Sequence, residues 1–134
     1  MKVLITGGAG YLGTVLTEEI LNRFPYAKVI VYDNLMYKQD GLFSFFKYPK
    51  DRFEFVYGDV RDKNSLLEQL QKLDKDNDYV IPLAAIVGFP ACARDEKLAT
   101  AVNFEHVKYI VQSTRCRIIY PNTNSGYGVS DGEA

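Results

Sequence analysis

The sequence predicts an α/β domain built on a doubly wound parallel sheet, with helices covering both faces of the sheet. Short runs of valine and isoleucine without polar interruption indicate strands that are buried on both faces. Amphipathic segments separate these runs, and this alternation is typical of right-handed crossovers between parallel strands. The chain has 134 residues, of which 47% are hydrophobic and 25% charged, as expected for one folded domain with a substantial core.

Five strands are predicted along the chain. They cover residues 2–6 (KVLIT), 28–33 (KVIVYD), 52–58 (RFEFVYG), 79–83 (YVIPL) and 117–120 (RIIY). Proline has no N–H to donate to a neighbouring strand. Pro82 should therefore make the hydrogen bonding of the fourth strand irregular near its carboxyl end.

Three amphipathic helices are predicted between the strands. The first is marked by apolar residues at helical spacing before Pro25, namely Leu12, Val15, Leu16, Ile20, Leu21 and Phe24. The other two cover residues 65–73 and 95–113, each with its apolar residues on one face. The aromatic segment 42–48 (LFSFFKY) is expected to form a short helix or loop that packs against the domain.

The charge and hydropathy of the chain argue against some classes of partner. The formal net charge is −1 and the basic residues are interspersed with acidic ones, so neither nucleic acid nor a membrane surface is an expected partner. The apolar run that opens the chain is too short for a signal sequence or a membrane span. The cytoplasm is therefore the default location.

The cysteines and the histidine form no recognisable site. Cys92 and Cys116 have neither C-x-x-C spacing nor a matched pair of histidines, so no disulfide, zinc or other metal site is expected. Cys92 follows the fourth strand and could approach a ligand, although a packed thiol is the preferred interpretation. His106, in the predicted long helix, is expected to be solvated or packed and is assigned no function.

A glycine-rich turn lies between the first strand and the first helix. It contains Gly8-x-Gly10-x-x-Gly13, the fingerprint of a Rossmann-type dinucleotide site, in the context that this fingerprint requires. Glycine allows the tight turn, lets a diphosphate approach the backbone, and lets the helix pack closely on the strand. The N-terminus of the helix then offers free N–H groups to the phosphates. A purely structural turn and a flavin site are the alternatives.

An acidic residue ends the second strand. Asp33 follows Gly13 by about 20 residues, the spacing at which an acid binds the adenosine ribose in dinucleotide-binding domains. Its carboxylate would accept hydrogen bonds from the ribose hydroxyls and repel a 2′-phosphate, which favours NAD over NADP. The alternative is an aspartate that only starts the turn Asp33-Asn34.

Six motifs in a fixed order resemble those of one family. They are TGGAGYLG at 6–13, YDNL at 32–35, GDVRD at 58–62, LAA at 83–85, VN at 102–103 and NTNSGYG at 122–128. With them the chain resembles the extended short-chain dehydrogenase/reductase family, in the NAD-dependent epimerase/dehydratase group that acts on nucleotide-activated sugars. The resemblance spans essentially the whole chain and weighs against a flavin.

The resemblance implies a set of residues that bind NAD. In the glycine turn these are Gly7, Gly10, Tyr11, Leu12 and Gly13, and after the next strands they are Asp33, Asn34, Asp59, Val60, Leu83, Ala84 and Ala85. Asp59 and Val60 would lie beside the adenine ring, and residues 83–85 along the central part of the cofactor. Without the family pattern, Asp59 or Asp62 would be equally well explained as the cap of a helix that starts near Asn64. Asn103 is implied as a supporting residue that holds main-chain groups.

The last motif implies the groups that face the sugar. Thr123 takes the place of the family's catalytic hydroxyl, and Ser125 is a second hydroxyl nearby. A plain polar turn after the fifth strand is the alternative. In dehydratases this motif reads Thr-Asp-Glu, whereas here Asn124 and Ser125 stand where the two acids would be. Neither can transfer protons near neutral pH, so epimerisation or simple redox chemistry is favoured over 4,6-dehydration.

The family's general base is the tyrosine of a Tyr-x-x-x-Lys pair, and the sequence contains no such pair. The resemblance places it beyond residue 134, so residues 1–134 are expected to be a partial NAD-binding Rossmann domain, incomplete at its C-terminal end and inactive alone. In the full-length protein a tyrosinate would take a sugar hydroxyl proton, NAD would accept hydride, and the keto-sugar would be reduced again. The alternatives are a non-catalytic NAD(P) sensor and an NAD-dependent sugar-nucleotide reductase or dehydratase. A homodimer is a possible assembly.

Overall fold

The computed structural model describes residues 1–122 of the chain, and in these residues five parallel strands form one sheet. The strands are β1 Lys2–Thr6, β2 Lys28–Asp33, β3 Phe53–Tyr57, β4 Tyr79–Pro82 and β5 Arg117–Ile118. Their order in the sheet is β3-β2-β1-β4-β5, and every neighbouring pair is parallel. The order reverses between β1 and β4, where a doubly wound sheet opens a crevice at the carboxyl ends of its strands.

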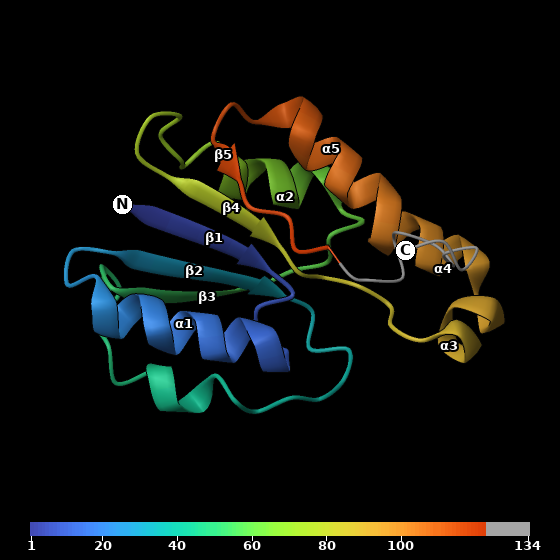
Figure 1. The fold of residues 1–134 in the computed structure, drawn as a ribbon, viewed down its shortest axis with the longest axis horizontal. Helices are drawn as coiled ribbons and strands as arrows, with labels where there is room; N and C mark the ends of the chain where they lie inside the picture. Colours follow the sequence, from blue (N-terminus) through green and yellow to red (C-terminus); the bar gives the residue numbers. More distant parts are fainter. Residues whose placement is uncertain (123–134) are drawn as a thin grey trace, which may run out of the picture.

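Helices cover both faces of the sheet (Figure 1). They are α1 Tyr11–Arg23, α2 Lys63–Leu70, α3 Phe89–Arg94, α4 Glu96–Thr100 and α5 His106–Ser113, with a 3₁₀ turn at Phe43–Phe45 and a π-helical segment at Ala101–Glu105. Helix α1 and the 3₁₀ turn lie on one face, and α2 and α5 lie on the other. The predicted doubly wound α/β fold is confirmed.

Alternate residues of the strands fill two separate cores. In β1, Val3 and Ile5 pack toward α1, while Leu4 packs toward α2 and α5. This alternation explains why the strands have no polar face in the sequence. The aromatic segment packs as expected, because Phe45 is buried and its ring lies 5.4 Å from the ring of Phe53.

The apolar stripe predicted for α1 is only partly correct. The residues of α1 that the structure buries fully are Gly13, Thr17 and Leu21, whereas the predicted Leu12, Val15 and Phe24 are exposed. Gly13 and Thr17 are small, so they allow the helix to approach the sheet closely. The Thr17 hydroxyl donates to the Gly13 carbonyl at 2.8 Å, which satisfies its polar group in this buried position.

Pro82 ends β4 at a point where its missing N–H matters little. Its neighbour β5 pairs only with Tyr79 and Val80, so on that side the ladder has stopped before Pro82. On the other side Pro82 stands in register with Thr6, and Leu83 N donates to the Thr6 carbonyl at 2.9 Å. The predicted strand 117–120 is correspondingly shorter than expected.

The predicted helix over residues 95–113 is continuous but not regular. It begins with α4, passes into the π-helical segment and continues as α5. Helix α3, which precedes it, was not predicted. None of the helices in residues 1–122 is both long and apolar enough to cross a membrane.

Candidate functional site

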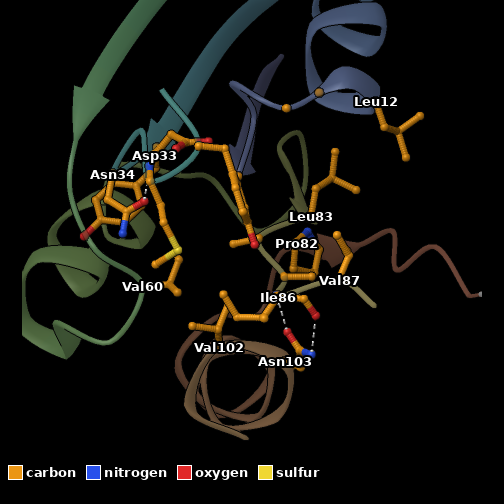
Figure 2. A pocket seen from close by; sticks show the side chains of 18 of the residues that line it. Leu12, Asp33, Asn34, Val60, Pro82, Leu83, Ile86, Val87, Val102 and Asn103 are labelled. Atoms are coloured by element: carbon orange, nitrogen blue, oxygen red, sulfur yellow. Dashed lines mark hydrogen bonds between the residues drawn. The ribbon is translucent and has the colours of Figure 1, made fainter. Parts of the chain in front are cut away.

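A cavity of about 820 Å³ lies at the carboxyl ends of the strands. All twelve residues that the sequence predicts for a cofactor line it, namely Gly7, Gly10, Tyr11, Leu12, Gly13, Asp33, Asn34, Asp59, Val60, Leu83, Ala84 and Ala85. Figure 2 shows Asp33 and Asn34 on one side of the cavity and Leu83 and Val87 on the other. Thr123 and Ser125 lie outside the described residues, while Tyr120 and Pro121, just before them in sequence, line the cavity.

Side chains would not fit at Gly7, Gly8 or Gly13 of the glycine turn, and at Gly8 a Cβ would lie 2.8 Å from Cγ1 of Val31. Gly7 has φ +69°, and a Cβ there would lie 2.5 Å from the Cα of Ala84. A Cβ at Gly13 would lie 2.5 Å from the Cα of Gly8. Gly7 and Gly13 therefore bring the turn against the loop after β4 and bring α1 against the turn.

Gly10 differs from the other glycines of the turn because a Cβ would fit there. Within the described residues, a Cβ at Gly10 would meet only the Gly7 carbonyl oxygen at 3.4 Å and Gln39 Nε2 at 3.8 Å. Gly10 is also the N-cap of α1, and no side chain among residues 1–122 caps this helix end. The first N–H groups of α1 and the positive end of its dipole thus face the cavity, where they can hold an anion.

The Asp33 carboxylate connects the glycine turn to the loop after β2. Its Oδ2 accepts from Ala9 N at 3.0 Å, and its Oδ1 accepts from Leu35 N at 2.7 Å. The Asp33 side chain therefore starts the turn Asp33-Asn34, which was the alternative to a binding role. It also lines the cavity. Each carboxylate oxygen has a second lone pair with which it can accept from a ligand hydroxyl.

Asp59 and Asp62 have different positions and different partners. Asp62 caps α2 by accepting from Ser65 N at 3.1 Å. Asp59 lines the cavity and forms a bidentate ion pair with Arg61, with Oδ1 to Nε at 2.9 Å and Oδ2 to Nη2 at 2.6 Å. The Arg61 side chain, as the main cause, lowers the pKa of Asp59 to about 2, so Asp59 is ionised near neutral pH and its charge is paired with that of Arg61.

Asn103 holds the loop that follows β4. Its Oδ1 accepts from Ile86 N at 2.7 Å and its Nδ2 donates to Ile86 O at 2.9 Å, as Figure 2 shows. The main-chain role expected for Asn103 is confirmed. The Cys92 thiol donates to the same Ile86 carbonyl at 3.3 Å and is half-buried, which agrees with a packed thiol.

The family of the chain follows from comparison with known proteins. The sequence model of the NAD dependent epimerase/dehydratase family matches residues 3–133. The chain belongs to this family. The resemblance that the six motifs indicated is thereby confirmed.

Relatives within the NAD dependent epimerase/dehydratase family have several activities. The chain is 32% identical to CDP-paratose 2-epimerase of Salmonella typhi, an alignment that covers 96% of this chain and 38% of that protein. It is 30% identical to UDP-N-acetyl-alpha-D-glucosaminuronate decarboxylase of Bacillus cytotoxicus, with 95% and 38% covered. The crystal structure of dTDP-glucose 4,6-dehydratase from Streptomyces venezuelae, with NAD and TYD bound, matches with a TM-score of 0.83 at 26% identity, covering 100% of this chain and 43% of that one. The chain thus spans less than half the length of each relative.

Several residues on this epimerase/dehydratase-family cavity were not identified from the sequence. The largest group follows β2 and consists of Met36, Tyr37 and Gln39, and a second group continues the loop after β4 with Ile86 and Val87. No motif marks these loop positions. Only their place in the sequence could have indicated these residues, because each group comes soon after predicted site residues at the carboxyl end of a strand.

Proposed function

We propose that the chain is the NAD-binding part of a nucleotide-sugar epimerase-like enzyme that acts by transient hydride transfer at a sugar carbon. The observation that carries this proposal is the opening at Gly10, which faces the cavity beside the uncapped N-terminus of α1. Family membership and relatives that act on nucleotide sugars support it.

Each part of a dinucleotide can be assigned to a group of residues that line the cavity. The N–H groups of Tyr11 and Leu12 would hold the diphosphate, because Gly10 has no side chain that would keep the diphosphate away from the backbone there. Asp33 and Asn34 would hold the adenosine ribose, and Asp59 and Val60 would border the adenine. Leu83, Ala84 and Ala85 would border the central part of the cofactor, with Gly7 and Gly13 shaping the turn.

The fixed acids favour NAD over NADP in this proposal. The Asp33 carboxylate is anchored by two main-chain N–H groups, so it cannot move away from a ligand without breaking them. A 2′-phosphate on the ribose would meet this negative charge, and the described residues that line the cavity include no lysine or arginine to offset it. The unphosphorylated ribose would instead donate hydrogen bonds to it.

The sugar chemistry is proposed for the longer protein. When bound, NAD supplies a hydride acceptor at the nicotinamide end of the site. The hydroxyls of Thr123 and Ser125 are proposed to bind and orient the sugar, since Tyr120 and Pro121, which come shortly before them in the sequence, line the cavity. Asn124 and Ser125 cannot serve as an acid and base pair, which favours epimerisation over dehydration.

Titration calorimetry with NAD and NADP tests the proposed cofactor and the role of Asp33. The wild-type chain should bind NAD at least about tenfold more tightly than NADP, which corresponds to a repulsion between like charges of about 1.4 kcal/mol or more. Asp33→Asn should bring the ratio of the two affinities close to one. A general loss of structure would weaken the binding of NAD and NADP alike, because the two ligands differ only in the 2′-phosphate. The ratio of their affinities therefore reports on Asp33 alone.

The matched control is Asp76→Asn, which removes one negative charge from an exposed residue that does not line the cavity. It should leave both affinities unchanged. A wild-type preference for NADP, or an unchanged ratio in Asp33→Asn, would show that this carboxylate does not select the ribose.

A further inference from the structure

The single histidine of the sequence is buried between the sheet and the long helix. His106 is only 2% exposed, and its Nε2 lies 3.2 Å from the hydroxyl of Thr6, a residue with no exposed surface at the end of β1. Its Nδ1 is bonded to the Val102 carbonyl one turn back in its own helix. The imidazole therefore connects the strand that leads into the glycine turn with the helix on the opposite wall of the cavity.

The partners of the ring define its protonation state. A carbonyl oxygen only accepts, so the proton of the neutral ring must be on Nδ1, which donates to Val102. Nε2 then has a free lone pair and accepts from the Thr6 hydroxyl. Burial lowers the pKa of His106, which agrees with a neutral ring near pH 7.

The carbonyl that His106 binds lies in the π-helical segment. In an α-helix the His106 N–H would donate to Val102, but here it donates to Ala101, one residue earlier. The side chain of His106 thus occupies the carbonyl that its own backbone N–H does not use. The same segment carries Asn103, whose two hydrogen bonds hold Ile86 beside the cavity (Figure 2).

We propose that His106 is a positioning residue of the cofactor site. Its neutral ring maintains the π-helical register through Val102 and ties that register to Thr6, so that Asn103 holds the loop after β4 along the cavity. The inference rests on the proposed NAD site for its functional consequence. Its structural part, the fixing of Ile86, is independent of any ligand.

The chain offers two variants and a direct spectroscopic signal to test this role. His106→Ala removes both hydrogen bonds, whereas Thr6→Val removes only the hydroxyl and retains the shape of the side chain. Thr6→Ser should restore the wild-type behaviour. Since the sequence has one histidine, the ¹⁵N signals of its ring in the wild-type chain report the tautomer without assignment.

In the ligand-free wild type the ring should carry its proton on Nδ1. Hydrogen exchange at the Ile86 amide should be about tenfold faster in His106→Ala and in Thr6→Val, the change expected for weakening one buried hydrogen bond. Amides of β2 should be unaffected. The control Thr114→Val removes a hydroxyl that accepts from Cys116 N outside the cavity, and it should leave Ile86 exchange unchanged.

NAD affinity, measured by calorimetry, should fall about three- to tenfold in the same two variants and return to the wild-type value in Thr6→Ser. A proton on Nε2, or Ile86 exchange that is equally slow in wild type and Thr6→Val, would overturn the positioning role. If His106→Ala does not fold, the Thr6→Val variant alone tests the positioning role. A wild-type chain that binds no NAD would overturn the proposed function, while Ile86 exchange still decides the role of His106.

Discussion

At the scale of single residues, the pKa of Asp59 depends mainly on one neighbour, Arg61. Arg61 donates to both carboxylate oxygens, and Asn34 Nδ2 adds a longer contact of 3.4 Å to Oδ2. The pKa of Asp59 is held at about 2, below its ordinary value of 3.8. A depressed acid pKa means that the folded state binds the proton less readily than the unfolded state. Asp59 therefore stabilises the fold fully above pH 3.8 and loses this contribution as the pH falls toward 2.

Arg61→Gln should remove most of that contribution at neutral pH. We expect the free energy of unfolding to fall by about 1 kcal/mol at pH 7, less than the full pKa shift would give because the pair is partly exposed and screened. At pH 3 the difference between variant and wild type should be smaller. Urea unfolding at the two pH values measures both quantities.

The exposed pair Arg23 and Glu19 provides the comparison, because it is an i, i+4 ion pair on the surface of α1. Arg23→Gln should change the free energy of unfolding by less than about 0.5 kcal/mol at either pH. If Arg61→Gln and Arg23→Gln lowered the free energy of unfolding equally at pH 7, the pair of Asp59 and Arg61 would stabilise the fold no more than an exposed ion pair does.

At the scale of elements, α1 and the glycine turn form one packed unit. Gly13 and Gly8 approach so closely that no side chain fits between them, and Thr17 continues the close contact one turn later. This proximity aims the helix N-terminus at the cavity. The glycine spacing in the sequence therefore reports the packing of the helix as well as the binding of a ligand.

Gly13→Ala should destabilise the fold even though alanine is the better helix former. The added methyl group would overlap the Gly8 backbone, and we expect a loss of about 2 kcal/mol in the free energy of unfolding. Gly10→Ala, in the same turn, would place its methyl group at ordinary contact distances of 3.4 and 3.8 Å, and it should lose less than about 0.5 kcal/mol. Urea unfolding compares the two, and equal stability of Gly13→Ala and wild type would show that the helix does not depend on this contact.

The elements that the sequence predicted well are those whose physical signal is local. Strands β1 and β2 have unbroken apolar runs and end where glycine or aspartate interrupts them, so their limits coincide with the prediction. The π-helical segment could not be predicted because its register depends on His106 reaching a carbonyl and on Thr6, which is 100 positions away. The exposure of Leu12 and Val15 was missed for a similar reason, since close packing at Gly13 and Thr17 rotates the helix.

At the scale of the whole molecule, the sheet brings residues from separate sequence motifs together around one cavity. The glycine turn, Asp33, Asp59 and the loop after β4 follow four neighbouring strands of the sheet, whose carboxyl ends lie at the same edge. Motifs in family order could identify these residues in advance because each directly follows a strand. Loop residues such as Tyr37 and Gln39 reach the cavity through the path of the chain after β2, and a path of this kind leaves no repeating pattern in sequence.

The central claim is that an open backbone at Gly10 binds the diphosphate of NAD, and calorimetric titration of NAD into wild type and Gly10→Ala tests it most directly. The wild-type chain should bind, and the added methyl group should weaken the affinity at least about tenfold by occupying the space of the diphosphate, equivalent to about 1.4 kcal/mol. The melting temperature should remain within about 2 °C, since the fold accepts a Cβ there. Equal NAD affinity of the two proteins would contradict the account.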